Sequence, residues 1–308
     1  PDLALPGRDM IYRNMDMETG AVYSIPARRM NVAQIGTFIR KDWLDKLELP
    51  LPTTTEEFYN ALVQFKEKDP GGVGKNNVVP FTMTSDVRWR ASALIESFVD
   101  PNLSDKERWI NTVVERQYLL PGYKEGVRFL NKMYNDGLID NQFALYKDDT
   151  DSDNLIKMGV VGSFIHNWDQ PYRDTPGLLR DLRQNVPDAE IVSIDPFQNA
   201  EGKTVKGLYD SAGVNFFVPA FSKNVEGALR YINWLSKFEN RSYLQLGDEG
   251  VTHVVENGVP RLIPAEGEKI MNSPQNIDYT IMINGLDLGN DELNAKAIRS
   301  EEHTSELQ

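Results

Sequence analysis

Two short segments combine a tryptophan with side chains that form directional hydrogen bonds. They are SDVRWRAS, residues 85–92, and HNWDQPYRD, residues 166–174. An aromatic face can stack on an apolar ring, while guanidinium, amide and carboxylate groups bind a rim of hydroxyls. This composition is typical of a site for an uncharged, hydroxyl-rich ring compound. The candidate binding residues are Trp168, Trp89, His166, Asn167, Asp169, Arg88 and Arg90.

Each tryptophan also has a structural alternative. Trp168 could be a half-buried aromatic that only packs, and its polar neighbours favour binding over that interpretation. For Trp89 the two interpretations stay equally open. Trp43, Trp109 and Trp234 lie in helical patterns and are expected to be packing residues.

The overall charge argues against a polyanionic partner. The 33 basic and 46 acidic residues give a net charge of -13, which opposes binding to nucleic acid or to an anionic membrane surface. A small neutral ligand fits this balance better. The chain has no cysteine, which excludes disulfides, thiolate metal sites and cysteine nucleophiles. It also has no apolar run of about 18 residues, the length that spans a bilayer.

Catalytic motifs give no positive indication of an enzyme. The three histidines are His166, His253 and His303, and the sequence contains neither HExxH, nor GxSxG, nor a glycine-rich phosphate loop. Carboxylates are plentiful, so an Asp/Glu pair of a glycosidase remains an open alternative. No cofactor is expected.

Two aspartate-containing loops have part of the ligand pattern of a calcium-binding loop. Residues 69–80 begin with Asp69 but carry Gly71 and Val73 at the next ligand positions, so we expect no tight calcium site. Residues 149–154 (DTDSDN) have alternating aspartates but lack the loop glycine and a closing glutamate. The second loop is interpreted as a solvated helix cap, and no metal is expected.

Local patterns predict helices alternating with strands. A strand at 37–40 and a short helix at 41–47 precede a long helix capped by Thr53 or Thr54 with Glu56 or Glu57 three residues on. That helix ends near Lys68, and its apolar stripe is Phe58, Ala61, Leu62 and Phe65.

Further elements follow the same alternation. A helix from Lys124 to Asn135 has Val127, Leu130, Met133 and Tyr134 on one side, and another follows residues 222–224. Strands are expected at 159–165, 190–194 and 213–219. This alternation indicates an α/β fold.

Several pieces in order resemble a known family. They are VYSIP (22–26), FIRKDWLDKL (38–47), PTTTEEF (52–58), GLIDNQF (137–143), ALRYINWLSK (228–237) and GDEGVTHVVENGVP (247–260). The set resembles the sugar-binding extracellular solute-binding proteins of ABC importers, especially the long lipoproteins common in Gram-positive bacteria. The resemblance reaches about residue 290. One departure is Glu48, where relatives usually carry glycine, so a tight or strained turn is expected there.

The resemblance implies a two-lobe periplasmic-binding-protein-like fold of type II, with most of the first lobe missing from this sequence. Its expected parts are the end of the first lobe and a first crossing (1–36), the second lobe (37–205), a return crossing with part of the first lobe (206–256), and a C-terminal part of unassigned lobe (257–298). The last ten residues, 299–308, resemble the translation of a short-read sequencing adapter, so no fold or function is expected of them.

The resemblance also ranks the site residues. It implies that Trp168 stacks on a sugar and that Trp89 is the second candidate. At the two expected crossings, Arg28 with Arg29 and Tyr209 with Asp210 would line the floor of the cleft. Solvated surface residues remain the alternative for the two arginines.

The implied function is binding of a saccharide, with an oligosaccharide favoured, between two lobes and its delivery to ABC permease subunits. The expected protein is an extracellular, lipid-anchored monomer that is not an enzyme. Two alternatives remain: a carbohydrate-active hydrolase using an Asp/Glu pair, and an adhesion or sensory module without a permease.

Overall fold

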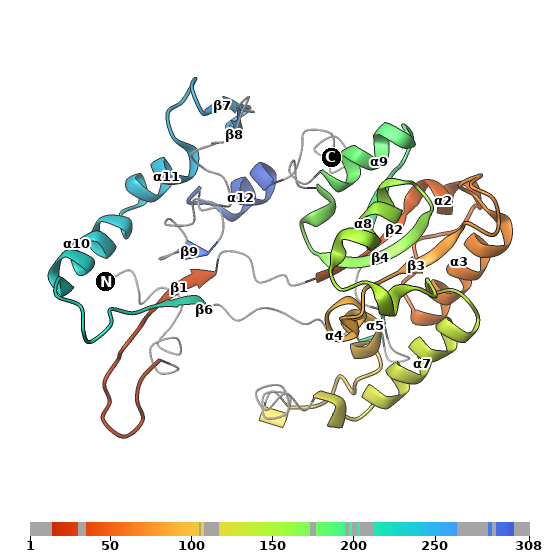
Figure 1. The fold of residues 1–308 in the computed structure, drawn as a ribbon, viewed down its shortest axis with the longest axis horizontal. Helices are drawn as coiled ribbons and strands as arrows, with labels where there is room; N and C mark the ends of the chain where they lie inside the picture. Colours follow the sequence, from red (N-terminus) through yellow and green to blue (C-terminus); the bar gives the residue numbers. More distant parts are fainter. Residues whose placement is uncertain are drawn as a thin grey trace. The chain divides into compact units, whose positions relative to one another are not determined.

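The chain divides into two compact units. The structure, a computed structural model, describes residues 14–29, 35–104, 106–107, 117–172, 177–194, 197–198, 202–203, 212–263, 283–284 and 288–298. One unit, here called the central unit, is Ala33–Gly207, and the other, the flanking unit, is Pro1–Val32 with Leu208–Gln308. Figure 1 shows the elements of each. No helix among the described residues combines the length and apolarity needed to cross a bilayer.

A four-stranded sheet organises the central unit. Its strand order is β3-β4-β2-β5, with β3 parallel to β4 and β2 antiparallel to both of its neighbours. The strands are β2 (Ile35–Arg40), β3 (Val79–Thr82), β4 (Val161–Asn167) and β5 (Ile191–Ile194). Strands β3, β4 and β5 therefore share one direction, and their carboxyl ends lie at one edge of the sheet. We call this the carboxyl edge.

Helices cover both faces of this sheet (Figure 1). Neighbouring residues of a strand point to opposite faces, so Ile39 and Ile165 enter one apolar cluster while Phe38 and Phe164 enter the other. Helices α3, α5 and α7 supply the first cluster, and α8 and α9 supply the second. The helices are α2 (Lys41–Lys46), α3 (Thr55–Lys68), α4 (Val87–Arg90), α5 (Ser92–Glu96), α7 (Tyr123–Asn135), α8 (Asp149–Lys157) and α9 (Leu178–Asn185), with short 3-10 turns η2 (Gln117–Leu119), η3 (Phe143–Leu145) and η4 (Gln170–Tyr172). This layering confirms the α/β prediction.

The start of α3 follows the predicted capping pattern. The Thr54 hydroxyl accepts a hydrogen bond from the Glu57 backbone N–H at 3.2 Å, and the Glu57 carboxylate accepts from the Thr54 N–H at 3.2 Å. These bonds lower the pKa of Glu57, with the largest contribution from the Thr53 N–H. The predicted stripe of Phe58, Ala61, Leu62 and Phe65 is buried along its length.

The turn after α2 is strained, as the sequence predicts. The Leu49 N–H donates to the Leu44 carbonyl at 2.9 Å and the Glu48 N–H to the Asp45 carbonyl at 3.0 Å, the pair of bonds of a Schellman motif. This motif requires a left-handed residue after the helix cap, and Glu48 has φ of 56°. A left-handed conformation is costly for any residue with a side chain.

Replacing Glu48 with glycine is therefore expected to raise the free energy of unfolding by about 0.5–1 kcal/mol. Asp69→Gly is the matched contrast, because Asp69 also has a positive φ of 51°. Its carboxylate, however, accepts hydrogen bonds from the Val73 N–H at 3.0 Å and the Gly74 N–H at 2.7 Å, so its loss should destabilise the protein. Urea unfolding tests the pair. A Glu48→Gly variant that is no more stable than the parent would rule out backbone strain at this turn.

Helix α7 buries a different face from the one predicted. Leu130 and Met133 are buried as expected, but Val127 and Tyr134 are 44% and 41% exposed. Gly126 faces the core instead, where an added Cβ would lie 2.5 Å from the carbonyl oxygen of Ile95 in α5. The close approach of the two helices at this glycine turns Val127 outward.

The described residues of the flanking unit form a sheet of order β6-β1-β9, a hairpin and the helices α10, α11 and α12. Its sheet pairs β1 antiparallel with β6 and parallel with β9. The elements are β1 (Ile25–Arg29), β6 (Ala212–Phe216), α10 (Val225–Leu235), α11 (Phe238–Leu246), β7 (His253–Glu256), β8 (Val259–Leu262), β9 (Ile283–Asn284) and α12 (Asp291–Ile298). The hairpin turn has positive φ at Asn257 and Gly258, as a type I′ turn requires.

The packing roles predicted for three tryptophans have different outcomes. Trp43 is fully buried, so the prediction is confirmed for it. Trp234 is 40% exposed and stacks on Tyr231 with ring centroids 6.1 Å apart, so it is a surface aromatic rather than a core residue. Trp109 lies outside the described residues. His253, predicted to be structural, is buried with Nδ1 3.0 Å from the Leu246 carbonyl oxygen.

Candidate functional site

The two tryptophan-containing segments leave the same edge of the sheet. Residues 85–92 follow β3 and residues 166–174 include the end of β4, and the two strands are parallel. Loops that leave the carboxyl ends of parallel strands lie next to one another, which is where α/β proteins commonly bind ligands. The chain also enters the central unit here, because Ile35 at the start of β2 pairs with Asn167.

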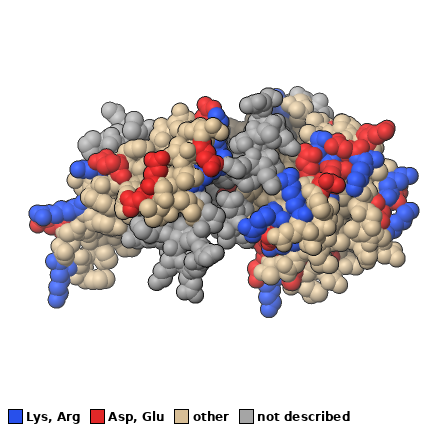
Figure 2. All heavy atoms as spheres, turned by 90° about the horizontal axis from the view of Figure 1, so that it is seen from above, with Lys and Arg blue, Asp and Glu red and all other residues tan. Residues whose placement is uncertain are grey.

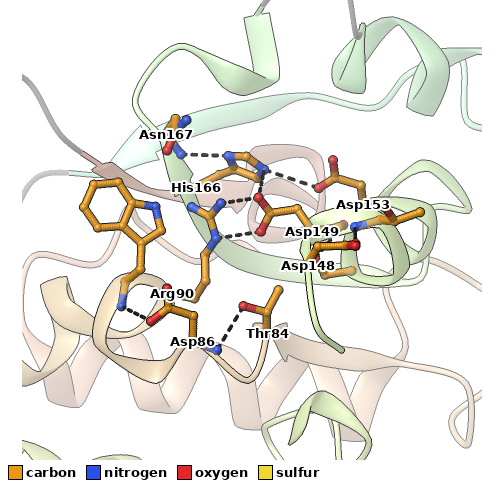
Figure 3. Close-up of polar contacts among 11 residues, drawn as sticks. Thr84, Asp86, Arg90, Asp148, Asp149, Asp153, His166 and Asn167 are labelled. Atoms are coloured by element: carbon orange, nitrogen blue, oxygen red, sulfur yellow. Dashed lines mark hydrogen bonds and ion pairs between the residues drawn. The ribbon is translucent and has the colours of Figure 1, made fainter. Parts of the chain in front are cut away.

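Arg90 and Asp149 join the first segment to helix α8 (Figure 3). The Arg90 Nε donates a hydrogen bond of 2.8 Å to Asp149 Oδ1, and Nη2 donates to Asp149 Oδ2. The Arg90 side chain is 7% exposed and that of Asp149 is 35% exposed. Two parallel bonds of this kind fix the orientation of both groups, so α4 is held against the start of α8.

His166 joins the second segment to the same carboxylate. Its Nε2 lies 3.7 Å from Asp149 Oδ2 and 3.4 Å from Asp153 Oδ1 (Figure 3). Its Nδ1 accepts a hydrogen bond of 2.7 Å from the backbone N–H of Asn167. Because Nδ1 is an acceptor, the neutral ring carries its proton on Nε2, facing the two carboxylates. The predicted residues Arg90, His166 and Asn167 therefore lie in one polar cluster.

Asp149 and Asp153 are the residues that the sequence interpretation missed. The expected solvated cap is wrong for both, because they turn toward Arg90 and His166 instead of water. The cap itself is Asp148, whose carboxylate accepts from the Thr150 N–H at 2.9 Å and whose pKa is lowered by that bond. The sequence feature that could have indicated their shared role is the i, i+4 spacing of Asp149 and Asp153, which places them on one face of α8.

A second cap positions Trp89. The Asp86 carboxylate accepts a hydrogen bond of 3.2 Å from the Trp89 N–H, and the Asp86 N–H donates to the Thr84 hydroxyl at 3.3 Å. These bonds hold the short helix α4 directly after β3. The side chain of Trp89 is half-buried while that of Arg88 is exposed.

The loop before α8 is tied to the same edge. The Ser85 N–H donates to the Tyr146 carbonyl oxygen at 3.0 Å. Tyr146 is only 9% exposed, and its burial, together with a hydrogen bond to Asp140, raises the pKa of its phenol well above the ordinary range. The phenol is therefore neutral at physiological pH.

The other predicted site residues are distributed as follows. Trp168 and Asp169 directly follow β4 at the carboxyl edge, and both are half-buried. Arg28 and Arg29 form the end of β1 in the flanking unit, and their side chains are outside the described part. Tyr209 and Asp210 are likewise outside the described residues.

No group of three His, Asp or Glu side chains among the described residues is arranged to hold a metal ion. The Asp69 carboxylate instead bonds the backbone of its own loop. The absence of a tight calcium site at residues 69–80 stays a prediction.

Acidic and basic side chains are mixed on the surface. On the face drawn in Figure 2, Lys and Arg are interspersed with Asp and Glu rather than gathered in a basic patch. This distribution agrees with the expectation, drawn from the net charge, of a ligand other than nucleic acid.

Comparison with known proteins gives consistent matches. A family model described as bacterial extracellular solute-binding protein matches residues 11–240. Lipoprotein LipO of Bacillus subtilis is 27% identical over 242 residues, which are 75% of this chain and 46% of LipO. The polygalacturonan/rhamnogalacturonan-binding protein YtcQ of the same organism is 25% identical over 84% of this chain and 48% of its own length. The chain thus spans about half the length of these two curated relatives.

A solved structure agrees in fold. The substrate-binding protein FusA of S. pneumoniae, in complex with kestose, superposes with a TM-score of 0.62 at 19% identity. The match covers 91% of this chain and 58% of that protein. The predicted two-lobe solute-binding fold is thereby confirmed at the level of the fold class.

Proposed function

Because this chain belongs to the family of bacterial extracellular solute-binding proteins, we propose that it binds a saccharide and delivers it to the permease of an ABC importer. The observation that carries the proposal is the polar cluster at the carboxyl edge. It connects Arg90, His166 and Asn167 beside two half-buried tryptophans. Aromatic rings and fixed hydrogen-bonding groups are the two components that sugar recognition needs.

The names of the relatives support a saccharide, and an oligosaccharide in particular. YtcQ is named for binding polygalacturonan and rhamnogalacturonan, and the FusA structure holds kestose. We infer that the ligand lies at the carboxyl edge, with Trp168 and Trp89 stacking on it. Asn167, Asp169 and Arg88 would bind its hydroxyls, and Arg28, Tyr209 and Asp210 would complete the site.

The mechanism we propose is closure of two hinged lobes around the ligand. Residues 37–205 would form one lobe. Residues 1–36 would hold the end of the other lobe and the first crossing, and residues 206–256 the return crossing and a further part of that lobe. Contacts from both lobes stabilise the closed form, and the permease distinguishes it from the open form. The protein would act outside the cell as a monomer, anchored through a lipid as the name of LipO suggests.

Isothermal titration with a panel of oligosaccharides tests this function, with chromatography of the sugars after incubation. We expect saturable, reversible binding and recovery of the sugar unchanged. Cleavage of the sugar, reduced by replacing one carboxylate, would favour the hydrolase alternative. A panel without any binding would reject the saccharide proposal.

Trp168→Ala is expected to weaken saccharide binding by about 1–3 kcal/mol, because the substitution removes the apolar surface on which the ring stacks. Trp234→Ala is the matched control, since this tryptophan is an exposed surface residue in the flanking unit. Dissociation constants of both folded variants are compared with that of the parent. An unchanged constant for Trp168→Ala would remove Trp168 from the site.

A further inference from the structure

We propose that the carboxyl edge selects neutral saccharides over saccharides that contain uronic acids. This inference rests on the proposed function, since it concerns the ligand of the same site. It differs from what the relative named for polygalacturonan would suggest. Two features of the cluster support it: Arg90 is already paired with Asp149, and acidic side chains outnumber basic ones.

The buried side chain of Arg90 is already paired with a carboxylate of the protein, that of Asp149. A free guanidinium would bind a uronate through two parallel hydrogen bonds. In Arg90 those positions, Nε and Nη2, are occupied by Asp149. The remaining nitrogen, Nη1, is buried from solvent. Arg90 therefore has one nitrogen left, so it cannot offer a ligand carboxylate the two parallel hydrogen bonds that a free guanidinium would.

Acidic groups exceed basic groups around the cluster. Asp149 neutralises Arg90, and the carboxylate of Asp153 faces His166 Nε2 at 3.4 Å. In residues 85–92, 146–153 and 166–169, the acidic side chains are Asp86, Asp148, Asp149, Asp151, Asp153 and Asp169, and the basic ones are Arg88, Arg90 and Lys147. A uronate brought to this edge meets like charge, which disfavours its binding.

Acceptor atoms suited to hydroxyl donors are present at the same place. Asn167 Oδ1 is buried without a hydrogen-bond partner among the described residues, and Asp153 Oδ1 is buried 3.4 Å from His166 Nε2. A buried acceptor gains most from a donor, and a sugar hydroxyl supplies one. An ionised carboxylate only accepts hydrogen bonds, so it cannot satisfy either oxygen. Charge and hydrogen-bond capacity thus favour the same class of ligand.

The test compares sugars that differ only in the charged group. The full-length protein is titrated with galacturonic acid oligomers and with the same oligomers after reduction of each carboxylate to a hydroxymethyl group. Other neutral oligosaccharides are titrated in parallel to establish that a saccharide binds at all. We expect the neutral members to bind at least tenfold more tightly than the uronic ones.

Two isosteric variants locate the selectivity. Asp153→Asn removes one negative charge from the cluster and is expected to reduce the preference for neutral sugars at least threefold. Asp188→Asn removes the same charge from an exposed position before β5, at the opposite edge of the sheet, and should leave the preference unchanged.

The outcomes separate the two proposals. Uronic oligomers that bind as tightly as their reduced forms, or more tightly, would overturn the selectivity while leaving saccharide binding intact. Equal effects of the two variants would overturn its assignment to Asp153. Absence of binding by every sugar would instead reject the proposed function and this inference with it.

Discussion

Trp43→Ala is expected to lower the free energy of unfolding by about 3–5 kcal/mol. The Trp43 ring is fully buried, and it packs edge-on against Phe65 with centroids 5.2 Å apart. The Arg40 guanidinium lies 4.8 Å from its centroid, and Gly71 packs so closely that an added Cβ would lie 2.6 Å from Trp43 Cζ2. Removing this ring leaves a cavity that rigid neighbours on α3 and β2 cannot fill.

Urea unfolding with two comparison variants tests the role of Trp43. Trp43→Phe should cost less than alanine, because it keeps an aromatic ring and removes a buried Nε1 that has no hydrogen-bond partner in the described part of the chain. Trp234→Ala should cost about 1 kcal/mol or less, since that ring is partly exposed. If the alanine variants of Trp43 and Trp234 lose equal stability, the apolar cluster around Trp43 does not organise the central unit.

Asp149→Ala is expected to destabilise the protein by about 2–3 kcal/mol, at or just below the lower end of the range of about 3–5 kcal/mol for breaking a buried ion pair. The lower end applies because the Asp149 side chain is 35% exposed to water, although that of Arg90 is only 7% exposed. Without Asp149, the guanidinium of Arg90 stays buried with no opposite charge bonded to it. His166 also loses one of the two carboxylates that face its Nε2.

A double-mutant cycle separates the buried charge from other effects of the substitution. The variant that combines Asp149→Ala with Arg90→Met should recover much of the lost stability, because no unpaired guanidinium remains. Asp151→Ala removes an exposed aspartate two residues further along α8 and should change stability by about 0.5 kcal/mol or less. Additive effects of Asp149→Ala and Arg90→Met would contradict the pairing.

Features that depend on neighbouring residues could be predicted from the sequence. The cap joins Thr54 to Glu57, three positions on, and each residue of the buried stripe of α3 lies at most three positions from the next. The family resemblance implies a glycine at position 48, and Glu48 has the left-handed φ that a glycine would favour. Local hydrogen bonds and helix periodicity are sufficient for such predictions.

Features that depend on packing between distant segments could not be predicted. Arg90 and Asp149 are 59 residues apart, so their ion pair exists only once α4 and α8 meet beside β4. The outward turn of Val127 likewise depends on the contact between Gly126 and Ile95. Sequence periodicity describes the helix but not the neighbour that approaches it.

The composition of two segments predicted the candidate site, and the sheet topology places both segments at the same edge. The sequence indicated Trp89 and Trp168 as members of two polar segments, and the parallel pairing of β3 and β4 explains why those segments leave one edge. The binding roles of the individual residues and the lobe boundaries remain predictions.

A crystal structure of the full-length protein with a bound neutral oligosaccharide tests the central claim most directly. We expect an intact sugar whose ring stacks on Trp168 or Trp89, with its hydroxyls bonded to Asn167 and neighbouring groups of the carboxyl edge. A sugar bound elsewhere, in contact with neither residues 85–92 nor residues 166–174, would contradict it.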